Sequence, residues 1–221
     1  MTDHTTNENS AARLPLLQAL EGRRSIRRYL PDPVPDDHLR EIVRLATLAP
    51  SASNKQMWRF VAVRDRNLLN QMAAVIEEKI EEMAAWPESK GRERQILASK
   101  SWNLFFTGAP VTFVVLVSPY ASSTEAVLQA RGLSPAEIDA LRQRPDLQSI
   151  GAAVENLLLA AYAYGYGTVW MTGPLVAARE LEKLLGIEPP WRIACLVPMG
   201  RPAEHPEPHP RKPLAEVLEI R

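Results

Sequence analysis

One helical stretch in the second half of the chain constrains the fold more than any other feature of the sequence. Residues 147–164 repeat apolar side chains at helical spacing, and these side chains cover most of the helix circumference. A helix that is apolar nearly all round must be buried from several sides. The stretch is therefore either the central helix of a large core or a helix shared with a second subunit. Its apolar positions are Ile150, Ala153, Val154, Leu157, Leu158, Ala161 and Tyr162.

The rest of the pattern mixes helices with strands. Alternation predicts a strand at 58–63, and a continuous apolar run predicts a buried central strand at 111–117. Two further strands are expected at 168–171 and 192–199. Helices are expected at 12–22, 36–48, 67–86, 134–142, 147–164 and 176–185, the second capped by Asp36 and the fourth opened by a capping box. This order indicates an α+β or α/β fold.

Two segments break the pattern. Residues 86–100 are charged and lose their periodicity, so they form either an exposed connection or a mobile cover over a site. Residues 202–213 hold five prolines, which predicts an extended C-terminal arm over 201–221. We see no internal repeat and no dividing linker, so residues 12–221 are expected to form a single domain. The polar residues 1–11 are expected to be a disordered tail.

Charge and cysteine content narrow the class of protein. The 26 basic and 26 acidic residues cancel, so the basic footprint of a nucleic-acid binder is missing. No apolar run approaches the roughly 20 residues that a membrane helix requires, which predicts a protein outside the membrane. The single cysteine, Cys195, lies in an apolar run and suits a buried position and a reducing compartment. We therefore expect a cytoplasmic protein.

Several common chemistries lack their sequence motifs. The chain has no GxGxxG after a strand, no GxxxxGK[ST] and no HExxH. Its four histidines show no paired metal-ligand spacing in a regular element, so no metal site is expected. Ser51 and Ser53 lack a GxSxG context, which leaves hydrolysis without support.

An arginine cluster is the first feature that does point to a ligand. Residues 23–29 read RRSIRRY and follow a predicted helix. The planar guanidinium group matches the oxygens of a phosphate or carboxylate, and Ser25 adds a hydroxyl and a backbone N–H. The alternative is a solvated basic turn, which is the more common role of a basic run.

Two other segments fit the same ligand. The loop 50–56, PSASNKQ, offers hydroxyls and the amides of Asn54 and Gln56, which suit a polar heterocycle or a polyol. Arg211 and Lys212 form a second basic pair far away in the sequence. A ligand with a phosphate at one end, a polyol in the middle and a ring system at the other would use all three segments.

Four segments together resemble the nitroreductase superfamily of FMN-dependent flavoenzymes. They are RRSIRRYLPDPVPDDHL, LATLAPSASNKQMWRFVAV, GAAVENLLLAAYAYGYGTVWMTGP and VPMGRPAEHPEPHPRKPLAEV, in that order, and they span residues 22–217. The resemblance implies an α+β fold with a central, mostly antiparallel sheet flanked by helices. It also implies an intertwined homodimer with FMN at the subunit interface, which would account for the apolar helix at 147–164.

The resemblance assigns cofactor contacts to this chain. The arginine motif implies contacts to the FMN phosphate and ring edge, and the 50–56 loop implies contacts across the dimer interface. The turn after the glycine-rich strand implies backbone donation to the flavin, and the C-terminal basic pair implies a return to the phosphate. The implied residues are Arg23, Arg24, Ser25, Arg27, Pro50, Ser51, Ala52, Ser53, Asn54, Gln56, Thr172, Gly173, Arg211 and Lys212.

The implied activity is reduction of electron-poor acceptors such as nitroaromatics or quinones by NADH or NADPH, in a ping-pong cycle in which no side chain need act as acid or base. Trp86, where a cover would begin, is the candidate substrate contact. Members that deiodinate tyrosines clamp the substrate with Glu, Tyr and Lys, but here Trp86 stands four residues after Glu82 and no Tyr is secure. A dehalogenase, a flavin-fragmenting enzyme, a dehydrogenase and a flavin-binding protein without turnover stay open as alternatives.

Overall fold

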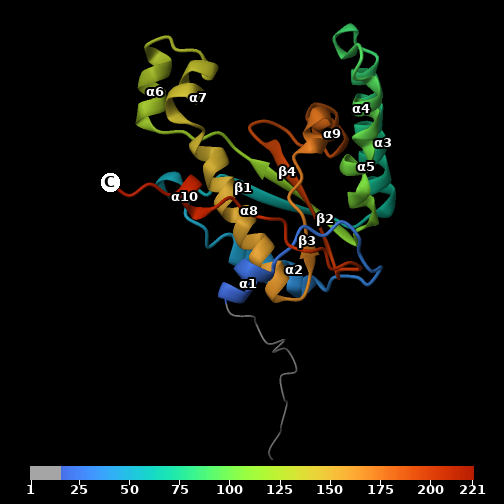
Figure 1. Cartoon of the computed structure of the whole chain (residues 1–221). Helices are drawn as coiled ribbons and strands as arrows, with labels where there is room; N and C mark the ends of the chain where they lie inside the picture. The colour runs from blue at the N-terminus through green and yellow to red at the C-terminus, as the bar shows by residue number, and fades with distance from the viewer. Residues whose placement is uncertain (1–15) are drawn as a thin grey trace, which may run out of the picture.

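A four-stranded antiparallel sheet forms the centre of the computed structural model, which describes residues 16–221 (Figure 1). The strands are β1 (Trp58–Val63), β2 (Val111–Val117), β3 (Gly167–Thr168) and β4 (Arg192–Gly200), in the order β1-β2-β4-β3. β2 pairs with β1 from Trp58 opposite Val117 to Val63 opposite Thr112. Because β2 is central and helices cover both faces, all seven of its residues are buried.

One face of the sheet carries α2 (Asp36–Ala46) and α8 (Pro145–Ala163). The α8 residues at helical spacing pack with Leu39 and Ile42 of α2 and with the inward side chains of β2 and β4. α1 (Leu16–Gly22) lies against the C-terminal part of α8, with Gly22 so close that an added Cβ would meet the Tyr162 hydroxyl. α8 is therefore the central helix of this half of the core.

The other face carries α3 (Arg66–Ala84) and α9 (Ala178–Leu184). Leu69, Met72, Ile76 and Ile80 of α3 pack on the opposite side of β2 and β4, since side chains alternate along a strand. The 3₁₀ segments Phe105–Gly108 and Gly173–Ala177 complete this layer. α4 (Glu93–Ala98) and α5 (Lys100–Asn103) continue along α3 at one side of the molecule (Figure 1).

The hairpin of α6 (Ser123–Ala130) and α7 (Pro135–Arg142) projects from the body between β2 and α8 (Figure 1). α7 begins with the expected capping box of Ser134 and Glu137. Gln143 and Arg144, at the return to α8, both have a left-handed backbone. Neither of the two core clusters includes a residue of the hairpin.

The antiparallel sheet flanked by helices is confirmed, and several expected boundaries are wrong. Residues 87–103 are mostly helical, but these helices are short and bury no apolar side chain, so they give no readable period. α6 was not predicted, for the same reason. The strand expected at 168–171 is limited to β3, after which only Met171 bridges back to Leu196. The N-cap of α2 is Pro35, and Asp36, the expected cap, is the first helical residue. The Asp36 carboxylate forms an ion pair with Arg64 instead.

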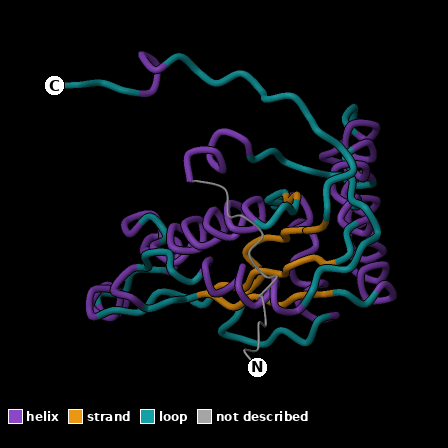
Figure 2. Tube along the Cα trace, turned by 90° about the horizontal axis from the view of Figure 1, so that it is seen from below, coloured by secondary structure: helices purple, strands orange, loops and turns teal. Residues whose placement is uncertain are grey.

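Residues 1–15 lie outside the described part, so the predicted tail and the predicted helix start at 12 are not tested. The C-terminal segment has no regular structure from 203 to 213 and ends with α10 (Leu214–Val217), well away from the sheet (Figure 2). Within residues 16–221, no helix is both long and apolar enough to cross a bilayer.

Candidate cofactor site

The arginine motif is fixed beside the short edge strand β3. Ser25 forms a parallel bridge with Thr168, and the Ile26 N–H donates to the Thr168 carbonyl over 3.0 Å. Ile26 is buried directly against Gly167, where a Cβ would lie 2.6 Å from the Ile26 side chain. Gly167 is therefore required for the motif to lie this close to the sheet.

The guanidinium groups of the motif have different surroundings. Arg24 donates to the carbonyls of Glu21 and Arg23 and so satisfies the C-terminal end of α1. The Nε atom of Arg23 lies 3.7 Å from a Glu155 carboxylate oxygen on α8. The Arg27 guanidinium lies 5.4 Å from the centre of the Trp102 ring and makes a long contact, 3.4 Å, with the Ser25 carbonyl. Arg23 and Arg27 are thus weakly engaged and half-buried.

The C-terminal arm returns to this motif and closes a cavity of about 500 Å³. Five predicted phosphate-site residues line it together. They are Arg23, Arg24, Ser25, Arg27 and Arg211. Lys212 is exposed and is not among the lining residues. Arg27 and Arg211, which are 184 positions apart in the sequence, therefore line one cavity that holds four arginines together with Glu21 and Glu207.

The loop 50–56 is held in a strained conformation. Ser53, Asn54 and Gln56 have φ angles of 50°, 51° and 48°, which non-glycine residues rarely adopt. The Ser51 hydroxyl accepts from the Gln56 N–H over 3.0 Å. The Ser149 hydroxyl accepts from the Ala52 N–H, and Ser53 shares a hydrogen bond with Tyr120. The side chains from 53 to 56 face solvent, with Pro50 also exposed.

The loop does not meet the arginine motif within one chain. The loop contacts α8 at Ser149, whereas the end of α1 contacts α8 at Tyr162. These two positions are separated by about 20 Å, since an α-helix rises about 1.5 Å per residue. The two predicted halves of the cofactor site therefore lie toward opposite ends of α8.

Thr172 caps the 3₁₀ segment Gly173–Ala177 that follows β3, and Gly173 is the first residue of that segment. Gly173 packs against the buried Asn103 of α5, whose Oδ1 atom would lie 2.0 Å from a Cβ at this position. Trp102, the preceding residue, is the side chain that lies over Arg27. The short helix α5 therefore contacts the two segments predicted to bind the ends of a flavin.

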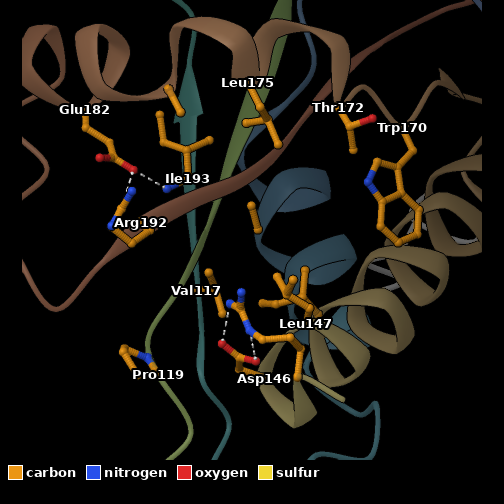
Figure 3. Close-up of a pocket in the computed structure, with 14 residues that line it drawn as sticks. Val117, Pro119, Asp146, Leu147, Trp170, Thr172, Leu175, Glu182, Arg192 and Ile193 are labelled. Atoms are coloured by element: carbon orange, nitrogen blue, oxygen red, sulfur yellow. Dashed lines mark hydrogen bonds and ion pairs between the residues drawn. The ribbon is translucent and has the colours of Figure 1, made fainter. Parts of the chain in front are cut away.

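A second cavity, of about 490 Å³, opens beside Thr172 (Figure 3). Its walls are mostly apolar but include two ion pairs, and Trp170 and Thr172 lie on one side of it. Its two arginines are already paired, Arg192 with Glu182 and Arg144 with Asp146. This cavity therefore offers an apolar surface next to the predicted flavin turn, with little unpaired charge.

The sequence did not single out Asn103, Ser149 or Tyr120, because none belongs to a motif, and it indicated core or interface packing for Trp102. Trp86, the predicted substrate contact, is 45% exposed at the end of α3, whereas the 64% exposed Trp102 is the tryptophan beside Arg27. Cys195 is buried, and burial raises the pKa of its thiol to about 12, so a thiolate nucleophile is not available. Among residues 16–221, no group of three or more His, Cys, Asp or Glu side chains is placed to hold a metal ion.

A model of the nitroreductase family matches residues 20–201, a range that includes the arginine motif, the 50–56 loop and the whole sheet. The chain belongs to the nitroreductase family. Its likeness to individual family members extends over nearly the full length. It is 34% identical over 212 residues to a protein named NADH dehydrogenase from Thermus thermophilus, and the match covers 94% of this chain and 98% of that one.

Two solved structures show the same architecture for this nitroreductase-family chain. A BluB-like flavoprotein from Clostridium difficile 630 is 29% identical, with a TM-score of 0.85 over 94% of this chain and 99% of that chain. An iodotyrosine deiodinase bound to FMN and 3-iodo-L-tyrosine is 26% identical, with a TM-score of 0.68 over 94% and 98%. The fold is thus nitroreductase-like, as the sequence predicted.

Proposed function

We propose that this nitroreductase-family chain is an FMN-dependent oxidoreductase that uses NADH or NADPH to reduce electron-poor acceptors, such as nitroaromatics or quinones, by a ping-pong mechanism. The observation that carries the proposal is the cavity in which Arg211 joins Arg23, Ser25 and Arg27. A solvated basic turn would not explain why the distant C-terminal arm returns to the same cavity.

The residues present fit FMN at both ends of the proposed site. Guanidinium groups from two segments suit the dianionic phosphate, with Lys212 as a further cation from the arm. Gly173 has no side chain, so its backbone approaches the cofactor closely, and its N–H is the proposed donor to the flavin ring. Pro50, Ser51, Ala52, Ser53, Asn54 and Gln56 are the proposed contacts from the loop.

The separation of the loop from the motif along α8 supports a homodimer with one site at each side of the interface. In such a dimer, the loop of one chain reaches the arginine motif of the other. Exposed apolar side chains support the same assembly, because they have no cover within residues 16–221 and monomers rarely expose so many. They include Leu16, Leu17 and Leu20 of α1 and Leu214, Val217, Leu218 and Ile220 of the C-terminal arm.

FMN supplies hydride acceptance and donation when it is bound, and the protein supplies position and electrostatics. Arg23, Arg27 and Arg211 orient the phosphate and offset its charge. The Gly173 N–H stabilises negative charge on the ring edge, and α5 holds this backbone in place through Asn103. No described side chain needs to act as an acid or base. We place the protein in the cytoplasm, with Cys195 reduced.

The visible spectrum of the purified protein tests the proposal directly. We expect a yellow protein, with the absorbance of oxidised flavin lost on anaerobic addition of NADPH or NADH and recovered on addition of a nitroaromatic. A flavin that neither nucleotide reduces would indicate a flavin-binding protein without turnover. A colourless protein that takes up no FMN would contradict the proposal entirely.

The dimeric site predicts an asymmetric result for mixed dimers. One chain carries Arg23→Ala and the other Asn54→Ala, with different affinity tags that allow the heterodimer to be isolated. If the loop acts on the partner's site, one site receives both changes and the other receives none. We expect one FMN per heterodimer to bind with wild-type affinity. Two weakened sites, one with the Kd of the Arg23→Ala protein and one with that of the Asn54→Ala protein, would show that the loop serves its own chain.

A dehalogenase is the second candidate function, and the likeness to iodotyrosine deiodinase favours it. Lys100 is already paired with Glu77 and Glu81 of α3, so its ammonium group is not free to bind the carboxylate of a zwitterionic substrate. Turnover of a nitroaromatic under NADPH, compared with turnover of a halotyrosine under dithionite, separates the two activities. A flavin-fragmenting reaction would be recognised by loss of the flavin itself.

A further inference from the structure

The carboxylate of Glu204 joins the two segments that form the phosphate cavity. Its Oε1 atom accepts hydrogen bonds from the backbone N–H groups of Arg27 and Arg28, over 2.6 and 3.2 Å. Its other oxygen, Oε2, lies 3.9 Å from the Arg28 guanidinium. An ionised acceptor with two backbone donors makes stronger hydrogen bonds than a neutral one. One side chain of the arm thus fixes the backbone of the arginine motif.

Backbone hydrogen bonds also join residues 26–30 to residues 201–204 of the arm. The Leu30 N–H donates to the Arg201 carbonyl, and the Ala203 N–H donates to the Arg28 carbonyl, each over 2.9 Å. Tyr29 bridges to Pro202, and its hydroxyl donates to the Ile26 carbonyl. Burial raises the pKa of Tyr29 well above its usual range, and the nearby negative charge of Glu204 raises it further. This hydroxyl therefore keeps its proton at all physiological pH values.

The chain between Glu204 and Arg211 is stiff. Pro206, Pro208 and Pro210 fix three φ angles and favour an extended conformation with little freedom. An anchor at Glu204 therefore limits where Arg211 can lie, although six residues separate them. Arg211 lines the cavity with Arg23 and Arg27.

We propose that Glu204 is a positioning residue for phosphate binding. It holds the start of the arm against the arginine motif and so sets the placement of Arg211 relative to Arg23 and Arg27. Glu204 does not touch the phosphate itself, since its carboxylate is occupied by the motif backbone. The inference rests on the proposed function, in which the cavity receives the phosphate of FMN.

Riboflavin, which lacks the phosphate, provides the discriminating measurement. In fluorescence titrations, Glu204→Ala is expected to raise the Kd for FMN about tenfold or more, while the Kd for riboflavin stays unchanged. Glu204→Gln keeps an acceptor oxygen for the two N–H groups and is expected to lose less affinity. It also carries the test if Glu204→Ala fails to fold. Glu188→Ala, an exposed glutamate in another part of the chain, is the matched control.

Amide hydrogen exchange of the protein without flavin tests the anchor separately. Glu204→Ala should speed exchange at the Arg27 and Arg28 amides, and Glu188→Ala should not. Equal losses of FMN and riboflavin affinity would show a general structural role and overturn the proposal, as would unchanged FMN affinity or unchanged exchange at both amides. If the wild-type protein binds neither flavin, the proposed function fails along with the phosphate-positioning role, and faster exchange then identifies Glu204 as an anchor of the arm only.

Discussion

Replacing Arg23 with alanine is expected to weaken FMN binding by about 1.5–3 kcal/mol, or roughly 10- to 150-fold in Kd. The guanidinium of Arg23 lines the proposed phosphate cavity and is only weakly held by Glu155, 3.7 Å away. Its removal deletes the proposed charge-assisted hydrogen bond to the FMN phosphate. It also removes the cation that lies nearest to the Glu155 carboxylate among the arginines of the motif. Arg27→Ala should behave in the same way. Quenching of flavin fluorescence in a titration measures both affinities.

The control for this result is an arginine of the projecting hairpin. Arg131 is exposed at the end of α6, so Arg131→Ala changes the net charge by the same amount without altering the cavity. Its Kd for FMN should equal that of the wild-type protein at matched ionic strength. Wild-type affinity in both Arg23→Ala and Arg27→Ala would contradict the assignment of the phosphate site.

Replacing Leu157 with alanine is expected to lower the free energy of unfolding by about 2–5 kcal/mol. Leu157 is fully buried at 0% exposure in the middle of α8, where it packs with α2 and the inner face of the sheet. Its truncation leaves a cavity that the surrounding close-packed side chains do not fill. Urea denaturation, followed by far-ultraviolet circular dichroism at fixed protein concentration, measures the change.

The same substitution at an exposed leucine serves as the comparison. Leu141 of α7 is 63% exposed and belongs to neither core cluster. Leu141→Ala should change the free energy of unfolding by no more than about 0.5 kcal/mol. If Leu141→Ala lowered the free energy of unfolding as much as Leu157→Ala, the hairpin would have to pack against another subunit.

The parts of the fold that sequence patterns predicted are those whose burial is regular. β1 and β2 begin and end where alternation and a continuous apolar run place them. α8 is buried where it packs on α2 and the sheet, and its partly exposed positions include Ala152 and Leu159 as well as Glu155. α4, α5 and α6 escaped prediction because each is short and buries few or no apolar side chains.

The sequence likewise predicted which segments form the candidate site but not the side chains that hold them together. The meeting of Arg211 with the arginine motif was expected from the resemblance, and the cavity between them is observed. What the sequence did not reveal is how the segments are held: Glu204 on the motif backbone, Asn103 against Gly173, and Ser149 on the loop. These side chains act through contacts between segments far apart in sequence, and such contacts leave no local pattern to read.

The projecting α6–α7 hairpin has a consequence for how this protein changes over evolutionary time. It is inserted between β2 and α8 and supplies no side chain to either core cluster. Its sequence and length are therefore under weaker selection for stability than those of the helices that flank the sheet. Yet Tyr120, at its base, is hydrogen-bonded to Ser53 of the proposed cofactor loop. Under the proposed function, substitution or insertion in this hairpin would change the surroundings of the loop at Ser53 without altering the residues that form the core.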